Sequence, residues 1–140
     1  MFHKVLVATD GSENAKKAIA YAMNLLRHNQ DAKVTLINAF HIPPVGPEPA
    51  THWRMAEVFQ EYSQSVLDNA AEMFEKENLP VTRVSVEGDP GQAVCRYARE
   101  HGYDHIVIGA TGHGQLGALL FGSVARKIIQ LAPCPVIIIR

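Results

Sequence analysis

Glycines are concentrated in the segment from Gly109 to Ser123, at a spacing that suits phosphate binding. Glycines allow a backbone to turn sharply and to approach a ligand closely, and successive amide groups in such a loop form a nest for anionic oxygens. A helix-like run follows the loop, and a helix N-terminus adds partial positive charge. The Ser123 hydroxyl can donate to a phosphate oxygen or help to hold a metal ion. The segment therefore predicts a site for a phosphate-bearing ligand.

Two standard phosphate-binding motifs do not explain this segment. Gly112-x-Gly114-x-x-Gly117 has the letters of the dinucleotide fingerprint. That fingerprint belongs to the first strand–helix turn and requires an acidic residue about 20 positions later. The corresponding residues, 136–140, contain no Asp or Glu. The P-loop string Gly-x4-Gly-Lys-[Ser/Thr] is absent from the sequence.

Strand-like and helical segments alternate along the sequence. This alternation predicts βαβ units, a five-stranded parallel sheet and a three-layer α/β sandwich. The first, fourth and fifth strands are apolar without alternation, as expected where helices cover both faces of a sheet. The third alternates, which is typical of an edge strand. The expected strands are residues 5–8, 34–37, 81–86, 106–108 and 136–139.

Helical periodicity is expected in the four intervening segments. Asp89 is predicted to cap the third helix with Pro90 in its first turn, and the fourth helix is expected from about Leu116 to Leu131. Trp53, near the start of the second helix, is expected to be packed. The apolar stripes of the first two helices are Ala15, Ala18, Ile19, Ala22, Leu25 and Leu26, and then Met55, Phe59, Tyr62, Val66, Ala70 and Phe74.

Length and composition predict one folded domain over residues 1–140. The net charge of -1 argues against nucleic-acid binding, and no apolar run approaches the length of a membrane span. Cys95 and Cys134 fit neither a disulfide framework nor a Cys-x-x-Cys site, and are expected to be reduced core residues. Residues 1–4 lead directly into a strand without an apolar leader, so a cytoplasmic protein is expected. The proline-rich segment His41–Pro49 is interpreted as either a plain connector or a flap over a ligand.

A longer spacing, Gly109-x2-Gly112-x9-Gly122-Ser123, resembles the ATP-binding signature of the universal stress protein family. The segments from Val5 to Ser12, Gly88-Asp89-Pro90 and Cys134-Pro135-Val136 are similar to other parts of that family's pattern, so the resemblance covers essentially the whole chain. It implies an adenine nucleotide alpha hydrolase-like fold with strand order 3-2-1-4-5. It also implies a homodimer, and the apolar last strand, Val136–Ile139, is the edge through which we expect two copies to pair.

The same resemblance implies a nucleotide cradle and its residues. In it, the main chain of Ala39 meets the adenine edge, and Gly109 to Gln115 surround the ribose and phosphates. Asp10 either accepts a hydrogen bond from the ribose or lies near Mg²⁺; the alternative is a turn residue that caps the first helix. The full set of expected site residues is Ala8, Asp10, Ala39, Gly109, Ala110, Thr111, Gly112, His113, Gly114, Gln115, Gly122, Ser123 and Val124.

One position departs from the family's pattern. Members often carry Arg or Lys directly after the second glycine of the signature, where this chain has His113. The loop therefore lacks a permanent cation, and Mg²⁺ or backbone amides must offset more of the phosphate charge.

The resemblance implies a stress-response protein in which bound ATP changes the binding of partners. Residues 105–140 contain no Asp or Glu to act as a general base beside the loop, so no dedicated catalytic residue is expected. Two alternatives stay open. One is a slow Mg²⁺-dependent ATPase, with ATP hydrolysis or autophosphorylation, and the other is a dimeric interaction module that needs no nucleotide.

Overall fold

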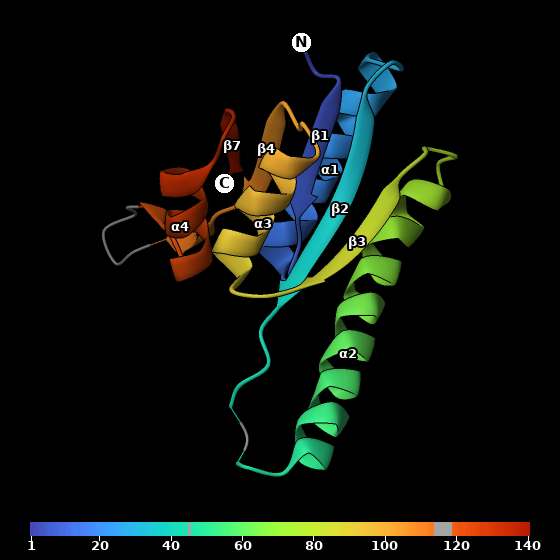
Figure 1. Ribbon diagram of the computed structural model, residues 1–140. Coiled ribbons are helices and arrows are strands. Elements are labelled where there is room, and N and C mark those ends of the chain that lie inside the picture. Colours follow the sequence, from blue (N-terminus) through green and yellow to red (C-terminus); the bar gives the residue numbers. More distant parts are fainter. Residues whose placement is uncertain (45, 114–118) are drawn as a thin grey trace.

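Strands and helices alternate along the chain, as Figure 1 shows. The computed structural model describes residues 1–44, 46–113 and 119–140. Its elements are β1 (Lys4–Ala8), α1 (Glu13–His28), β2 (Lys33–Phe40), α2 (Pro49–Glu75), β3 (Thr82–Glu87), α3 (Pro90–Glu100), β4 (His105–Gly109), β5 (Thr111–His113), β6 (Leu119–Leu120), α4 (Ser123–Leu131) and β7 (Val136–Ile139).

The main sheet has five strands in the order β3-β2-β1-β4-β7. Every neighbouring pair is parallel. Because β7 is the fifth strand of this sheet along the chain, the predicted order 3-2-1-4-5 is confirmed. β1 lies in the centre, where Val5 is opposite Val34 of β2 on one side and His105 of β4 on the other. β3 is an edge strand, as its alternating sequence predicts.

Helices cover both faces of the sheet, which confirms the three-layer α/β class. α1 and α2 pack on the face that carries Val5 and Val7, and α3 and α4 pack on the face that carries Leu6. All three of these β1 side chains are fully buried. The run of apolar residues without alternation therefore reflects two buried faces. Within the described residues, no helix is long and apolar enough to cross a bilayer.

The helix starts have identifiable causes. Ser12 caps α1, since its side chain accepts a hydrogen bond from the Ala15 amide at 3.2 Å. Asp89 caps α3 by accepting from the Gln92 amide at 3.1 Å, and Pro90 opens that helix, as predicted. Both caps satisfy amides that would otherwise lack a partner.

The predicted start of the fourth helix is wrong. α4 begins at Ser123 rather than at about Leu116. Leu119 and Leu120 instead form β6, which pairs antiparallel with β5, and residues 114–118 lie outside the described residues. The backbone before α4 is extended at Gly122, with φ -69° and ψ 171°. Hairpin hydrogen bonds between β5 and β6 thus replace the helical bonds that the apolar periodicity favoured.

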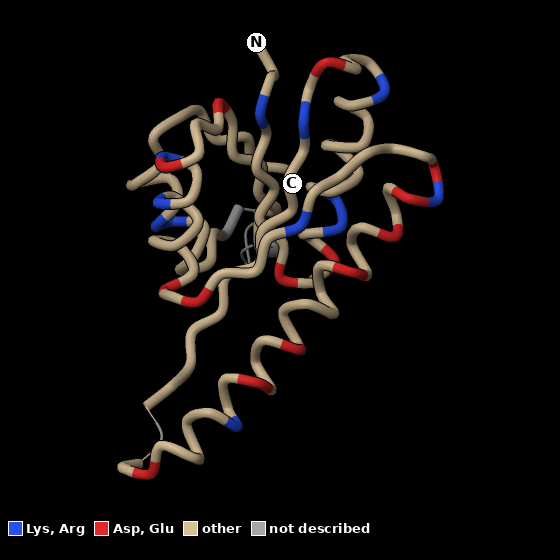
Figure 2. Tube along the Cα trace, turned by 45° about the vertical axis from the view of Figure 1, so that its right-hand side comes forward, with Lys and Arg blue, Asp and Glu red and all other residues tan. Residues whose placement is uncertain are grey.

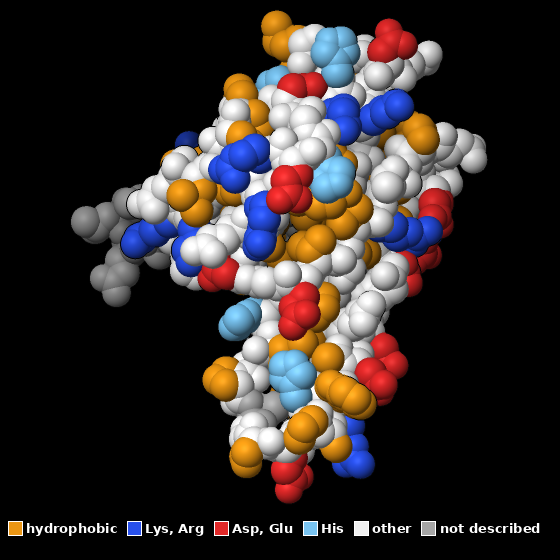
Figure 3. All heavy atoms as spheres, viewed as in Figure 1, with side chains coloured by type: hydrophobic (Ala, Val, Ile, Leu, Met, Phe, Trp, Pro, Cys, Tyr) orange, Lys and Arg blue, Asp and Glu red, His pale blue; other side chains and the backbone are white. Residues whose placement is uncertain are grey.

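The first half of α2 extends past the carboxyl ends of the strands (Figure 1), and Figure 3 shows hydrophobic side chains on this projecting part. The buried residues of α2 begin only at Ser63. Trp53 is 70% exposed and Tyr62 62% exposed, so the predictions that they pack are wrong. The periodicity is present, but no layer of the sheet reaches this half of the helix. Acidic residues are spread along α2 in Figure 2.

Candidate functional site

A cavity of about 280 Å³ lies at the carboxyl ends of the central strands. β1 is the strand on whose two sides the chain order reverses, because β2 and β3 lie on one side and β4 and β7 on the other. Open α/β sheets bind ligands at such a switch point. The lining residues are Ala8, Thr9, Asp10, Ser12, Asn14, Ala15, Ile37, Asn38, Ala39, Pro90, Val94, Ile108, Gly109, Gly122, Ser123, Val124, Ala125 and Ile128.

Much of the expected cradle borders this cavity. The expected residues among its lining are Ala8, Asp10, Ala39, Gly109, Gly122, Ser123 and Val124. Ala110 is buried directly after β4, and its amide donates to the Ile139 carbonyl at 2.8 Å instead of lining the cavity. Thr111, Gly112 and His113 form the backbone of β5, whereas the expected ligands Gly114 and Gln115 lie outside the described residues.

Sequence reasoning missed several residues of the lining. Thr9, Ser12 and Asn38 add polar groups, and Pro90 and Val94 add an apolar wall from α3. One signal for Asn38 is its type, since it is an amide directly after the apolar residues Leu36 and Ile37 of a strand. The described part of the proline-rich segment, residues 41–44 and 46–49, does not line the cavity.

Asp10 lies in the turn between β1 and α1. Its Oδ1 accepts a hydrogen bond from the Ser12 amide at 2.9 Å, and Ser12 in turn caps α1. Asp10 is therefore a turn residue, but it is not the cap of the helix. Its side chain is exposed and borders the cavity.

The described residues contain no group of three or more His, Cys, Asp or Glu side chains that would hold a metal ion. Mg²⁺ is commonly held by one or two carboxylates together with substrate phosphates and water. Asp10 fits the single-carboxylate version of that arrangement. A magnesium ion here would therefore depend on a phosphate ligand for most of its coordination.

The N-terminus of α4 differs from those of α1 and α3, which carry side-chain caps. The N-cap of α4 is Gly122, no side-chain hydrogen bond caps the helix within the described residues, and its first turn holds no acidic residue. Gly122, Ser123 and Val124 all border the cavity. A helix end whose first amides lack side-chain acceptors, and which faces a cavity, is suited to an anionic group.

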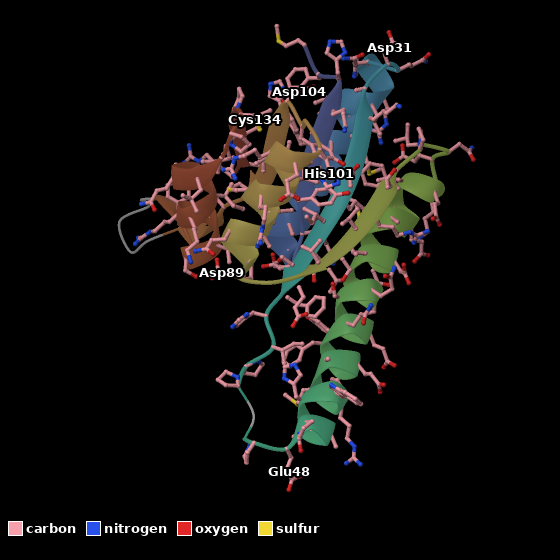
Figure 4. The ribbon with its side chains drawn as sticks, in the orientation of Figure 1. Asp31, Glu48, Asp89, His101, Asp104 and Cys134 are labelled. Carbon is pink, nitrogen blue, oxygen red and sulfur yellow. The ribbon has the colours of Figure 1, made fainter. Side chains whose placement is uncertain are left out.

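The two helices on this side of the cavity are joined by an ion pair. Lys127 Nζ of α4 lies 3.1 Å from both carboxylate oxygens of Asp89, at the start of α3. Figure 4 shows Asp89 at this end of the sheet, far from Asp104 and Cys134 at the other. The hydrogen bond from the Gln92 amide and the ammonium group of Lys127 lower the pKa of Asp89 below its usual value.

We expect Asp89 to stabilise the protein in a pH-dependent way. Asp89→Asn keeps an acceptor for the helix cap but removes the charge, and Asp89→Ala removes both, so melting temperature at neutral pH should fall in the order wild type, Asn, Ala. Because the folded-state pKa is lowered, the charge contributes stability above the ordinary carboxyl pKa, and this is lost as pH falls through the lowered value. Thermal melts followed by circular dichroism at pH 7 and at about pH 3 test this. A gap between wild type and Asp89→Asn that stays constant with pH would contradict it.

The sheet and its cavity define an open α/β protein with a crevice that suits a ligand, at the point where the strand order reverses. The chain belongs to the universal stress protein family, which it matches over residues 1–140. It is 33% identical to universal stress protein YxiE of Bacillus subtilis, over 100% of both chains. Universal stress protein UspA from Lactobacillus plantarum has a similar structure, with a TM-score of 0.82 and 25% identity over 99% of this chain and 98% of that one.

Two structures with bound nucleotides share the fold at lower identity. One is a universal stress protein family protein of Arabidopsis thaliana with AMP bound, at 20% identity and a TM-score of 0.70 over 97% of this chain and 90% of that one. The other is a universal stress protein in complex with cAMP, at 21% identity and a TM-score of 0.69 over 99% and 97% of the two chains.

Proposed function

We propose that this protein binds an adenine nucleotide, ATP by preference, in the cavity at the switch point, and that the bound nucleotide controls its binding to partners. The observation that carries the proposal is the N-terminus of α4, which has no side-chain cap in the described residues and opens onto the cavity beside β4. The amides of this first turn and the Ser123 hydroxyl provide donors for phosphate oxygens.

The opposite wall suits the nucleoside. Ala8 and Ile37 provide apolar surface, and the main chain of Ala39 supplies one donor and one acceptor at the end of β2. Asp10 stands between these two regions at the end of β1 and has a carboxylate oxygen, Oδ2, without a partner among the described residues. That oxygen serves a ribose hydroxyl, or Mg²⁺ when a phosphate is bound. Proteins with this fold have been found with AMP or cAMP bound, which supports an adenine nucleotide as the ligand.

A switch is favoured over an enzyme because the cavity lining contains one carboxylate, Asp10, and no histidine among the described residues. A slow ATPase that depends on Asp10 and Mg²⁺ is the alternative. The cytoplasm is the compartment that fits the proposal, since ATP is present there and the two free cysteines, Cys95 and Cys134, stay reduced.

The proposal is tested with the purified protein. We expect mass spectrometry of small molecules released on denaturation to detect an adenine nucleotide, and calorimetric titration to give saturable binding of ATP. Phosphate release from Mg²⁺-ATP that is abolished in Asp10→Ala would establish the ATPase instead. Failure to bind ATP, ADP and AMP at millimolar concentration would leave the nucleotide-independent interaction module.

We also propose a homodimer through β7. This strand pairs with β4 on one side only, and Val136 to Ile139 are all partly exposed. Pairing of two β7 strands about a two-fold axis would cover this apolar edge. Sedimentation equilibrium is expected to give about twice the chain mass of 15.4 kDa. A single species of one chain mass at tens of micromolar would refute the dimer.

A further inference from the structure

Asn38 is one of the few buried polar residues of the described chain, and it borders the cavity. Only 9% of it is exposed. Its side-chain Nδ2 donates a hydrogen bond to the main-chain carbonyl of Thr9, at 2.7 Å. A buried amide without a partner would cost free energy, so this bond fixes the side chain in place.

The bond changes how the ladder between β1 and β2 ends. The Thr9 amide donates to the Ile37 carbonyl at 3.0 Å. In a regular parallel ladder the next hydrogen bond would run from the Ala39 amide back to the Thr9 carbonyl. The Asn38 side chain donates to that carbonyl instead, and the described residues contain no hydrogen bond from the Ala39 amide to the Thr9 carbonyl.

The main chain of Ala39 is thereby left to face the cavity. The main-chain N–H and C=O groups of successive β2 residues point alternately to β1 and to β3. The Ile37 carbonyl accepts from Thr9 on the β1 side, whereas the Phe40 carbonyl accepts from Gly88 beside β3. Ala39 has the orientation of Ile37, and β1 has already ended beside it. Its N–H and C=O are therefore a donor and an acceptor at the cavity wall.

A donor next to an acceptor distinguishes purine bases. The edge of adenine presents an acceptor at N1 and a donor at the 6-amino group. Hypoxanthine and guanine present the reverse, a donor at N1 and an acceptor at O6. A site whose donor and acceptor match adenine leaves these two groups unpaired when hypoxanthine or guanine binds. The affinity for hypoxanthine and guanine is therefore expected to be much lower.

We infer that Asn38 is a positioning residue for base selectivity, which holds the Thr9 carbonyl so that the main chain of Ala39 stays available to adenine. This inference rests on the proposed nucleotide site. It adds a side chain that never touches the base, and it makes the selectivity for adenine depend on that side chain.

The test compares AMP with inosine monophosphate, which differ at this edge of the base. Asn38→Leu removes the donor to Thr9 at similar size and frees the Thr9 carbonyl for the Ala39 amide. We expect wild type to prefer AMP by about 100-fold in calorimetric titration, and Asn38→Leu to lose most of this preference through weaker AMP binding. Binding of inorganic tripolyphosphate, which has no base, is expected to stay within about twofold of wild type.

Thr35→Val is the matched control. Thr35 is also a buried polar residue of β2, but its hydroxyl pairs with the Tyr103 hydroxyl at 2.8 Å and it does not line the cavity. This variant should keep the AMP preference of wild type even if it is less stable. Equal loss of preference in Thr35→Val and Asn38→Leu would show a general structural effect and overturn the inference.

Asn38→Ala provides a second variant, since it also lacks the donor to the Thr9 carbonyl. In both Asn38 variants that fold, the Ala39 amide proton signal of the ligand-free protein should shift toward the position of a hydrogen-bonded strand amide. An Asn38 variant that folds and keeps the wild-type preference for AMP refutes the role of Asn38 alone. Wild type that binds neither nucleotide refutes the nucleotide site, and the inference with it.

Discussion

Gly122→Asp is expected to abolish nucleotide binding without loss of stability. Gly122 is the N-cap of α4 and lines the cavity, and its φ of -69° is accessible to any residue. An Asp side chain at this position accepts hydrogen bonds from the first-turn amides, which are the groups proposed to bind phosphate. Its negative charge also favours the helix N-terminus, so the free energy of unfolding should rise by up to about 1 kcal/mol.

The same charge opposes the ligand. Two like charges about 4 Å apart in a partly solvated site repel by about 4 kcal/mol, so we expect affinity for ATP to fall by at least about 100-fold. Calorimetric titration and urea unfolding measure the two effects on one protein preparation. Gly122→Ala is the control, because it adds a side chain with neither charge nor acceptor. ATP affinity within about threefold of wild type in Gly122→Asp would remove the α4 N-terminus from the site.

Gly109→Ala is expected to destabilise the fold, whereas Gly122→Asp is expected to weaken nucleotide binding without destabilising the fold. A Cβ at Gly109 would lie 2.3 Å from the Asn14 carbonyl oxygen and 2.6 Å from its carbon, both backbone atoms in the first turn of α1. Neither atom moves without displacing the helix from the end of β4. We expect unfolding free energy to fall by about 3 kcal/mol, at the upper end of the usual cost of overpacking.

Urea unfolding of Gly109→Ala beside Gly122→Ala tests this difference, because both variants add one methyl group to a glycine of the same sequence signature. Gly122→Ala should remain within about 1 kcal/mol of wild type. If Gly109→Ala unfolds at the same urea concentration as wild type, α1 does not depend on this close approach. Weak ATP binding by Gly109→Ala would say little about direct contact, since the cavity wall itself would have shifted.

The first and fourth strands were predictable because each contains a short, continuous apolar run that is buried. Val5 to Val7 include no polar residue, and all three are buried in the structure. The third strand alternates and is found at the sheet edge. The strand order came from the family resemblance, since no periodicity reports which strands are neighbours. Four of the expected site residues line the cavity because they lie at the carboxyl ends of strands that were correctly located: Ala8, Asp10, Ala39 and Gly109.

The errors arise where local pattern and three-dimensional neighbours disagree. The spacing of Leu119 and Leu120 continues the apolar periodicity of α4, but the backbone of these two residues pairs with β5 instead. Tyr62 lies on the periodic stripe of α2 but has no layer to cover it. The part played by Asn38 depends on a carbonyl 29 positions earlier in the chain, which sequence spacing cannot reveal.

The projecting half of α2 is expected to have a lower local stability than the half that packs on the sheet. Residues 49–62 contain no buried side chain, whereas Val66, Leu67 and Phe74 belong to the core. Because Met55, Ala56 and Phe59 are only partly buried, this stretch of about 14 residues gains little from packing. A helix of that length is marginal in water without such support, so this half can fray while the sheet stays intact. Its opening costs only part of the free energy of global unfolding. A protease that cuts near Trp53 therefore acts on the folded protein, whereas cleavage near Phe74 waits for the core to unfold.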